Sequence, residues 1–270
     1  MAARTQRARR PRAENSQIAI SNSHLESAPP VPHSPFPRVA LITGASGGLG
    51  RALVAEFHAQ GWRVAAGFHH ENAHAEGDSL LPLPLDVTSS DAVQSAVTQI
   101  LSRWRRVDLL INNAGNTSDN LSWQLTDEDW QRVLDVHLKG AFLCSQAVLR
   151  PMFKQRDGHI LNIASFSART GNRGQANYAG AKAALMGLTT SLAKEAGRRN
   201  VRVNAILPGV LHTPMTARLT PEQLAAFTAA NALGRFNALA EVARFTAFLA
   251  TTQNISGQFF QLDSRIARWA

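Results

Sequence analysis

From residue 38 onward, short apolar runs alternate with segments of helical periodicity, and this alternation restricts the fold more than any other feature of the chain. Apolar runs of this kind are typical of strands buried on both faces, and an intervening helix returns the chain so that successive strands run parallel. Strands are expected at residues 38–43, 62–68, 80–85, 107–112, 159–164, 201–207 and 258–262. Helices are expected at residues 48–60, 89–104, 126–153, 176–197 and 241–250. The sequence therefore predicts a doubly wound α/β domain, with a central parallel sheet of about seven strands and helices on both faces.

The first 36 residues differ from the rest because they are rich in Arg, Ser and Pro and lack hydrophobic periodicity. Such a segment buries too little apolar surface to offset the entropy lost on ordering. We expect a disordered tail over residues 1–36 and one folded domain over residues 37–270. The tail partly resembles an organellar transit peptide, since it is rich in Arg and poor in acidic residues. A dispensable extension is the alternative that we favour, and with it a cytoplasmic location.

Composition excludes several classes of protein. Because the chain has a single cysteine, Cys144, it has neither an intramolecular disulfide framework nor a Cys-based zinc site, and we expect no metal. No run of ~18 uncharged apolar residues occurs, so we expect no membrane span. The formal net charge is +9, but outside the tail the basic residues are scattered singly. Scattered charge favours solubility or the attraction of anionic ligands over nucleic-acid binding.

A glycine-rich loop, TGASGGLG at residues 43–50, lies between the first expected strand and the first expected helix. Glycines at this place let the backbone approach a pyrophosphate whose charge faces the helix N-terminus. The loop lacks the GK[ST] ending of a nucleoside-triphosphate P-loop. Its G-x-S-x-G pattern also matches the nucleophile elbow of hydrolases, but no upstream segment can supply an oxyanion loop there. A tight turn without a ligand remains the other reading.

A second constellation consists of Ser165, Tyr178 and Lys182. Ser165 follows an expected strand, and the carboxyl ends of parallel strands are where such sheets bind ligands. Tyr178 and Lys182 are four residues apart on the next expected helix and therefore share a face. An ammonium beside a phenol favours the phenolate and lowers the phenol pKa, which suits acid–base catalysis. A serine hydroxyl nearby can hydrogen-bond a substrate carbonyl while the tyrosine protonates it. The alternative is an ordinary helix face.

These motifs together resemble the short-chain dehydrogenase/reductase family. The resemblance rests on TGASGGLG (43–50), NNAG (112–115), Ser165 with YAGAK (178–182), and Pro208-Gly209 followed by Thr213, and it covers about residues 37–263. Within the family, residues 112–121, 171–185 and 206–216 look like β-ketoacyl-acyl-carrier-protein reductases of fatty-acid synthesis. The resemblance implies a Rossmann-type fold in which one domain binds the cofactor and performs catalysis.

The resemblance also implies roles for individual residues. Tyr178 would donate the proton, Lys182 would order the nicotinamide ribose and lower the tyrosine pKa, and Ser165 would orient the carbonyl. His137 stands where the family usually has the Asn of a proton relay, and we expect activity to persist. Residues 212–233 would form a lid over the substrate. The residues implied in cofactor binding, beside Tyr178 and Lys182, are Gly44, Ser46, Gly47, Gly48, Leu49, Gly50, His69, Asp86, Val87, Asn113, Ala114, Gly115, Pro208, Gly209 and Thr213.

Some positions depart from the family pattern. Gly47 replaces an Arg frequent in NADPH-using relatives, yet the second strand ends without the acidic residue that binds a 2′-hydroxyl, which favours NADPH. His69 or His70 is then placed to contact a 2′-phosphate. The usual Asp-Gly-Gly ending reads Asp263-Ser-Arg265. The segment between residues 68 and 80 is too short for the usual helix, so we expect an open adenine side.

The leading hypothesis is NADPH-dependent reduction of a 3-oxoacyl thioester on acyl carrier protein or coenzyme A. Arg156 and Arg199 match basic residues that dock the carrier in such enzymes, and docking an acidic carrier would fit the positive charge. Relatives imply a homotetramer. The alternatives are a short-chain reductase of another ketone, from polyketide or secondary metabolism, and a non-catalytic NADP-binding regulator.

Overall fold

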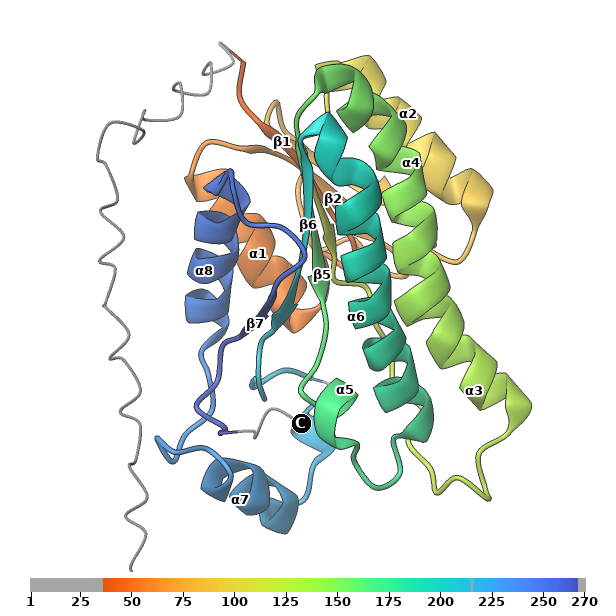
Figure 1. Ribbon diagram of the computed structural model, residues 1–270, viewed down its shortest axis with the longest axis vertical. Helices are drawn as coiled ribbons and strands as arrows, with labels where there is room; N and C mark the ends of the chain where they lie inside the picture. Colours follow the sequence, from red (N-terminus) through yellow and green to blue (C-terminus); the bar gives the residue numbers. More distant parts are fainter. Residues whose placement is uncertain (1–35, 215, 267–270) are drawn as a thin grey trace, which may run out of the picture. The chain divides into compact units, whose positions relative to one another are not determined.

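A computed structural model describes residues 36–214 and 216–266. Apart from Phe36, the predicted tail over residues 1–36 lies outside the described residues. Figure 1 shows a twisted sheet between two layers of helices. All seven strands are parallel, in the order β3-β2-β1-β4-β5-β6-β7. The strands are β1 (Val39–Ile42), β2 (Arg63–Phe68), β3 (Leu80–Pro84), β4 (Leu109–Asn112), β5 (Gly158–Ile163), β6 (Val201–Leu207) and β7 (Phe259–Gln261). The predicted doubly wound fold is confirmed.

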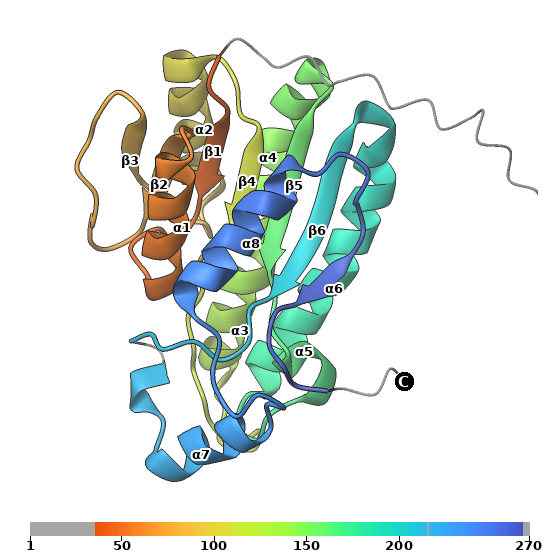
Figure 2. The same ribbon diagram turned by 90° about the vertical axis from the view of Figure 1, so that its left-hand side faces the viewer.

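Two hydrophobic cores lie on opposite faces of the sheet. In β1, Val39 and Leu41 pack into one core while Ala40 and Ile42 pack into the other, because successive side chains of a strand point to opposite faces. Helices α1 and α8 cover one face, and α2, α4 and α6 cover the other (Figures 1 and 2). The helices are α1 (Gly48–Ala59), α2 (Ser90–Trp104), α3 (Asp127–Leu134), α4 (Gly140–Gln155), α5 (Ser167–Thr170), α6 (Ala176–Ala196), α7 (Pro221–Ala229) and α8 (Leu239–Thr251).

The third strand forms as predicted although it contains Pro82 and Pro84. It lies at the edge of the sheet and pairs only with β2, where Pro82 is in register with Ala66 and Pro84 with Phe68. An edge strand tolerates proline because one side of its backbone makes no ladder hydrogen bonds. The position of β3 therefore explains a strand that its composition alone disfavours.

The helix predicted over residues 126–153 is interrupted. Thr126 caps α3 by accepting a hydrogen bond from the backbone N–H of Asp129 at 3.1 Å, and the chain remains helical to the end of α4. Between α3 and α4, however, the segment Asp135–Lys139 forms a π-helical turn, closed by the N–H of Gly140 donating to the carbonyl oxygen of Asp135. Such turns are frequent at functional sites. His137 lies within this turn.

The order of the strands reverses between β1 and β4. From β1 the chain moves outward to β2 and β3, and it then returns to the other side of β1 with β4. In sheets of this kind, ligands bind outside the carboxyl ends of the strands at such a switch point. In the part of the chain that the structure describes, no helix is long and apolar enough to cross a membrane.

Candidate active site

The glycine-rich loop follows β1 at the switch point. Gly44 has φ +64°, a left-handed conformation that an L side chain rarely adopts, and a Cβ on it would lie 2.8 Å from the Cα of Ala114. A Cβ on Gly50 would overlap the carbonyl oxygen of Gly44 and lie 2.8 Å from the Cα of Ala45. The first turn of α1 therefore packs directly onto the loop, and it can do so only with glycine at position 50.

The residues of this loop fit the pyrophosphate that the resemblance implies. Among the described residues, no side chain caps α1, and its first turn carries no acidic residue. The first N–H groups of a helix have no partner within the helix, and the helix dipole there attracts negative charge. The uncapped start of α1, held against a tight glycine turn, can therefore bind a phosphate group.

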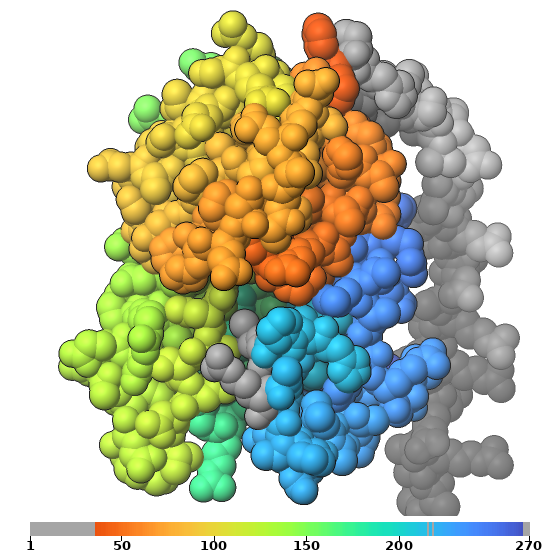
Figure 3. Space-filling view, turned by 180° about the vertical axis from the view of Figure 1, so that it is seen from behind, coloured from red at the N-terminus to blue at the C-terminus, as the bar shows by residue number. Residues whose placement is uncertain are grey.

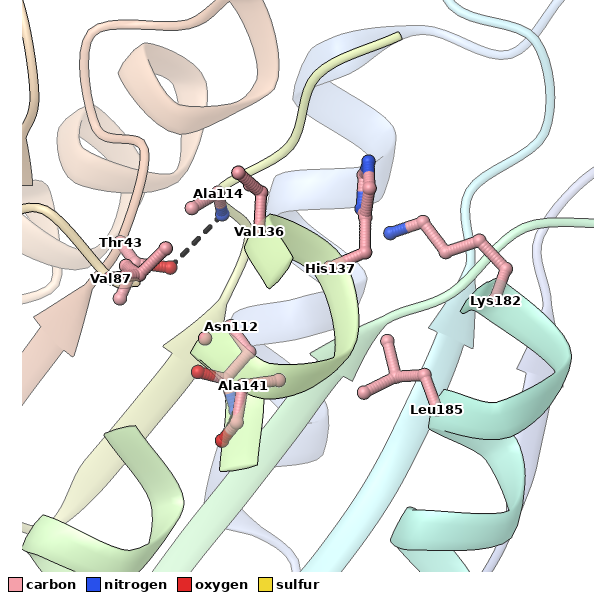
Figure 4. Close-up of a pocket in the computed structure, with 10 residues that line it drawn as sticks. Thr43, Val87, Asn112, Ala114, Val136, His137, Ala141, Lys182 and Leu185 are labelled. Atoms are coloured by element: carbon pink, nitrogen blue, oxygen red, sulfur yellow. Dashed lines mark hydrogen bonds between the residues drawn. The ribbon is translucent and has the colours of Figure 1, made fainter. Parts of the chain in front are cut away.

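Residues 113–115 are tied to the same loop. The hydroxyl of Thr43 accepts hydrogen bonds from the backbone N–H groups of Asn113 and Ala114, both at 3.0 Å. The side-chain amide of Asn113 donates to the carbonyl oxygens of Thr43 at 3.0 Å and Gly44 at 3.1 Å. Figure 4 shows the bond between Thr43 and Ala114. These contacts place the chain after β4 beside the chain after β1, where the resemblance expects the cofactor.

The segment between β2 and β3 contacts the glycine-rich loop on the expected adenine side. The chain after β2 crosses the glycine-rich loop, because the hydroxyl of Ser46 donates to the carbonyl oxygen of Glu71 at 2.5 Å and the ring of His74 lies 3.1 Å from the carbonyl oxygen of Ala45. His69 lies 3.8 Å from the carboxylate of Asp86, and both side chains remain accessible. The described segment between β2 and β3 forms no helix, as its length predicts.

The predicted catalytic residues meet at the carboxyl end of β5. Ser165 follows β5, Tyr178 lies in the first turn of α6, and Lys182 lies one turn later. The Ser165 hydroxyl lies near enough to the phenol of Tyr178 to lower its pKa. The Lys182 ammonium is buried, donates to the carbonyl oxygen of Ile163 at 2.5 Å, and lies 5.6 Å from the centre of the Tyr178 ring. The predicted constellation is therefore brought together.

The prediction that Lys182 lowers the pKa of Tyr178 is wrong for this structure. Burial has the largest effect and raises the pKa of the phenol. The Ser165 side chain lowers this pKa, and the nearby charge of Asp119 raises it further. Burial also lowers the pKa of Lys182 to about 7, because the charged ammonium loses its hydration. Spacing along a helix brings two groups together, but the desolvation that determines their pKa values depends on the surrounding fold.

His137 is buried in the same site. Its Nε2 lies 2.8 Å from the carbonyl oxygen and 3.2 Å from the backbone nitrogen of Asn116, so it donates to the first or accepts from the second according to the tautomer. Its ring lies edge-on to Tyr178, with the ring centres 5.1 Å apart. A Cβ on Gly115 would lie 2.6 Å from the ring. Burial, together with the charge of Lys182, lowers the pKa of His137 to about 3, so the imidazole is neutral at pH 7.

A small cavity borders this histidine. Figure 4 shows His137 and Lys182 directed toward one another across it, with Asn112 below. Among the residues that the structure describes, neither Nδ1 of His137 nor Oδ1 of Asn112 has a hydrogen-bond partner, although both atoms are buried. Buried polar atoms without a protein partner are commonly satisfied by water. The site therefore contains polar groups that are still able to bind a small ligand.

The expected nicotinamide end lies opposite the start of α1. Gly209 has φ +82°, and a Cβ on it would lie 2.6 Å from the Cβ of Asp263. Gly48 faces Thr213 so closely that a Cβ would lie 2.9 Å from the threonine methyl group. Figure 3 shows the segment that follows β6 (cyan) lying beside the glycine-rich loop and α1 (orange). The lid predicted over residues 212–233 contains α7, which the sequence reading did not predict.

Arg156 and Arg199 lie far from this site. Arg156 follows α4 and Arg199 follows α6, and the carbonyl oxygen of Arg156 accepts a hydrogen bond from the Asn200 side chain at 3.0 Å. Both precede strands, so they lie at the amino edge of the sheet, whereas Tyr178 lies at the carboxyl edge. The 21-residue helix α6 separates the two edges by about 31 Å.

The sequence reading singled out neither Asp119 nor Phe166. Asp119 accepts a hydrogen bond from the Gln175 side chain at 2.9 Å and acts electrostatically on Tyr178. Phe166 follows Ser165 and stacks on the Arg265 guanidinium, whose carbon lies 3.9 Å from the ring centre. The departure at residues 263–265 was a signal for this second contact, but its partner could not be identified without the fold.

Comparisons with known proteins agree with this geometry. A family model described as short chain dehydrogenase matches residues 38–224. The 3-oxoacyl-[acyl-carrier-protein] reductase FabG of Thermotoga maritima is 40% identical over 236 residues, which cover 84% of this chain and 96% of that protein. The 3-oxoacyl-[acyl-carrier-protein] reductase of Synechocystis sp. is 39% identical over 84% of this chain and 95% of its own length. The FabG of Escherichia coli is 40% identical over 80% of this chain and 91% of its own length.

Proposed function

The chain belongs to the short chain dehydrogenase family, and from this premise we propose that it reduces a 3-oxoacyl thioester to the 3-hydroxyacyl thioester with NADPH, as in fatty-acid synthesis. The names of relatives at about 40% identity over most of their length support the substrate class. The observation that carries the proposal is the burial of the Lys182 ammonium 5.6 Å from the centre of the Tyr178 ring, with Ser165 close enough to act on the pKa of the phenol.

The chemistry follows from the states of these side chains. The reduced nicotinamide, when bound, supplies the hydride to C3 of the substrate. Tyr178 gives its phenolic proton to the carbonyl oxygen, so that the ketone becomes an alcohol. The raised pKa of Tyr178 suits this direction of reaction, because the phenol holds its proton at neutral pH. Ser165, whose hydroxyl acts on the same phenol, would orient the same oxygen.

Lys182 and His137 support this proton transfer. With a pKa of about 7, Lys182 exists in both protonation states near neutral pH and can hold or release a proton beside the Tyr178 ring. His137 stays neutral, so it adds no second positive charge to the buried site. Its Nε2 makes one hydrogen bond to the backbone of Asn116, which holds the loop after residues 113–115.

NADPH is the proposed form of the cofactor because β2 ends at Phe68 with no acidic side chain to bind a ribose 2′-hydroxyl. His69 and His70 follow directly, with ring centres 4.1 Å apart, and His69 is accessible. We propose that this pair faces the 2′-phosphate. The His69→Asp variant should bind NADPH more weakly and NADH no worse. An unchanged ratio of the two affinities would contradict this part of the proposal.

The first experiment follows NADPH consumption with acetoacetyl-CoA, with NADH in parallel. We expect turnover with NADPH and loss of turnover in Tyr178→Phe, with NADPH binding, measured by fluorescence, unchanged. Turnover retained by Tyr178→Phe would remove the phenol from the mechanism. No turnover by the unaltered protein with any 3-oxoacyl thioester, despite NADPH binding, would refute the proposed substrate class.

A second candidate function is reduction of a ketone that is not attached to a carrier protein. The position of Arg156 and Arg199 favours it, because these arginines lie about 31 Å from Tyr178 of the same chain. If they dock a carrier, the substrate reaches the site of another copy, which would fit a homotetramer built through α4, α6 and β7. Carrier docking requires that Arg156→Glu raise KM for an acyl-carrier substrate and leave KM for acetoacetyl-CoA unchanged. An Arg156→Glu variant that affects KM equally for both substrates would favour the second candidate.

A further inference from the structure

A compact polar segment, Gln261–Arg265, lies at the end of β7, and we call it the C-terminal clasp. The Gln261 side-chain amide donates to the Asp263 carboxylate and to the carbonyl oxygen of Arg265, both at 2.7 Å. The Nε of Arg265 donates to the other carboxylate oxygen of Asp263 at 2.5 Å, and a second guanidinium nitrogen completes the ion pair. Figure 2 shows the described segment after β7 (dark blue) near α5 and α7.

The ion pair of the clasp is buried. The side chain of Asp263 is 2% exposed and that of Arg265 is 11% exposed. Removing one partner of a buried pair leaves the other charge without compensation. The carboxylate also accepts from Gln261, so its position is determined from several sides. A pair of this kind is rigid enough to hold the elements that touch it.

One side of the clasp contacts α5 and the residues just before it, which include Ser165 and which we call the Ser165 loop. The Arg265 guanidinium stacks on the ring of Phe166, the residue after Ser165 and the first flanking residue of α5. At the other end of this short helix, Arg169 donates to the Gln261 side chain at 3.5 Å. Both ends of α5 are therefore attached to the clasp, and with them the backbone that carries the Ser165 hydroxyl.

The other side of the clasp holds the end of the lid. The N–H of Ala232 donates to the carbonyl oxygen of Ser264 at 3.0 Å, and the N–H of Leu233 donates to the Ser264 hydroxyl at 3.1 Å. That hydroxyl donates in turn to the side chain of Asn231 at 3.3 Å. Asp263 also packs against Gly209, three residues before the lid. The C-terminal end of the lid and the chain just before its start therefore both contact the clasp.

We propose that Arg265 is a positioning residue, which through Asp263 and Phe166 holds the Ser165 loop and the lid in one fixed arrangement. This inference rests on the proposed reduction, in which Ser165 orients the carbonyl while the lid covers the substrate. The Asp-Gly-Gly ending typical of the family has no side chain at this place that could stack on Phe166. The lid end and the serine loop are therefore coupled in this chain by a residue that touches no substrate.

The first test compares Arg265→Ala and Arg265→Lys with Arg202→Ala. Arg202 is a matched control, because its side chain is as buried as that of Arg265 (7% exposed) and pairs at 2.6 Å with Asp157, which is 29% exposed, at the amino edge of the sheet. We expect Arg265→Ala to lower kcat with acetoacetyl-CoA on the order of tenfold, because small misplacements of catalytic groups are costly, while the Kd of NADPH changes less than about twofold. Arg265→Lys should fall between Arg265→Ala and the unaltered protein, since it keeps the charge and loses the stacking.

The second test is independent of turnover. Hydrogen exchange at residues 219–233 and in α5 should be faster in Arg265→Ala and unchanged in Arg202→Ala, measured well below each Tm. Unchanged kcat together with unchanged exchange in Arg265→Ala would overturn the proposal, and so would an equal fall of kcat in Arg202→Ala. If the unaltered protein shows no turnover, the proposed function fails, and the exchange data alone decide whether the clasp holds the lid.

Discussion

His137 makes the stability of the protein sensitive to acid, and the size of this effect can be worked out from the structure. The folded-state pKa of His137 is about 3, against an ordinary value of 6.5, because the ring is buried beside Lys182. Between these two values the unfolded chain binds a proton that the folded chain does not, so stability falls as pH drops below 6.5. At pH 5 this difference amounts to about 2 kcal/mol.

The perturbation is His137→Asn, which has no titrating side chain. The free energy of unfolding lost between pH 8 and pH 5 should be smaller in this variant by about 2 kcal/mol, or about 4–8 °C in Tm for a chain of this size. The measured quantity is the difference between two pH values, so any change that the substitution makes at both pH values cancels. Urea unfolding at pH 8 and pH 5, followed by circular dichroism, gives this difference directly.

His159 is the matched control. It is buried to the same degree at the start of β5, its pKa is also lowered to about 3 by burial and by Arg202, and it lies at the opposite edge of the sheet from Tyr178. His159→Asn should remove a similar part of the acid sensitivity without altering kcat. If His137→Asn keeps the full pH dependence of the unaltered protein, the ring is protonated in the folded state and the reasoning about the neutral site is refuted.

Three further substitutions test the packing of the site. Gly50→Ala should weaken NADPH binding more than tenfold, because its Cβ overlaps the carbonyl oxygen of Gly44. Gly187→Ala, which has open space on α6, should leave NADPH binding unchanged and be neutral for stability or stabilising by up to about 1 kcal/mol. Equal NADPH affinities of the two variants would contradict the packing argument. Asp108→Asn should lower the free energy of unfolding in urea by about 3 kcal/mol, because buried Asp108 pairs with Arg106 and accepts a hydrogen bond from the N–H of Val39 in β1. A loss below about 1 kcal/mol would contradict this. Lys182→Met should abolish turnover yet stabilise the fold at pH 7, on the order of 3 kcal/mol, because it removes a buried ammonium; a lower Tm would be the contrary result.

The strands and long helices were predictable because burial on both faces leaves an unmistakable pattern of apolar residues. Residues 201–207, for example, are apolar at most positions and form β6 over the predicted range. The lid helix α7 was not predicted, because none of its residues is fully buried and its apolar face is therefore weak. Its start carries a signal nonetheless, since Thr220 and Gln223 form a capping box around Pro221.

The sequence predicted which residues come together in the site, but it did not predict the direction of their pKa shifts. The spacing of Tyr178 and Lys182 places them on one face of any helix, so their proximity follows from local geometry. The direction of their pKa shifts depends on how deeply β5, α6 and the π-helical turn bury them, and no local pattern encodes that depth. The positions of Arg156 and Arg199 likewise depend on which edge of the sheet each connection occupies.

The π-helical turn at Asp135–Lys139 has a consequence for the whole helix that contains it. Each residue added to an α-helix rotates everything beyond it by about 100°. The extra residue of the wide turn therefore changes the rotation of α3 relative to α4. Helix α3 packs against α6, and α4 packs against α2, β4, β5 and α6. Deleting one residue within the turn would restore a regular helix, but it would also swing the side chains of α3 away from α6 by more than a quarter of a revolution. The number of residues in this turn is therefore constrained by the packing of α3 on α6.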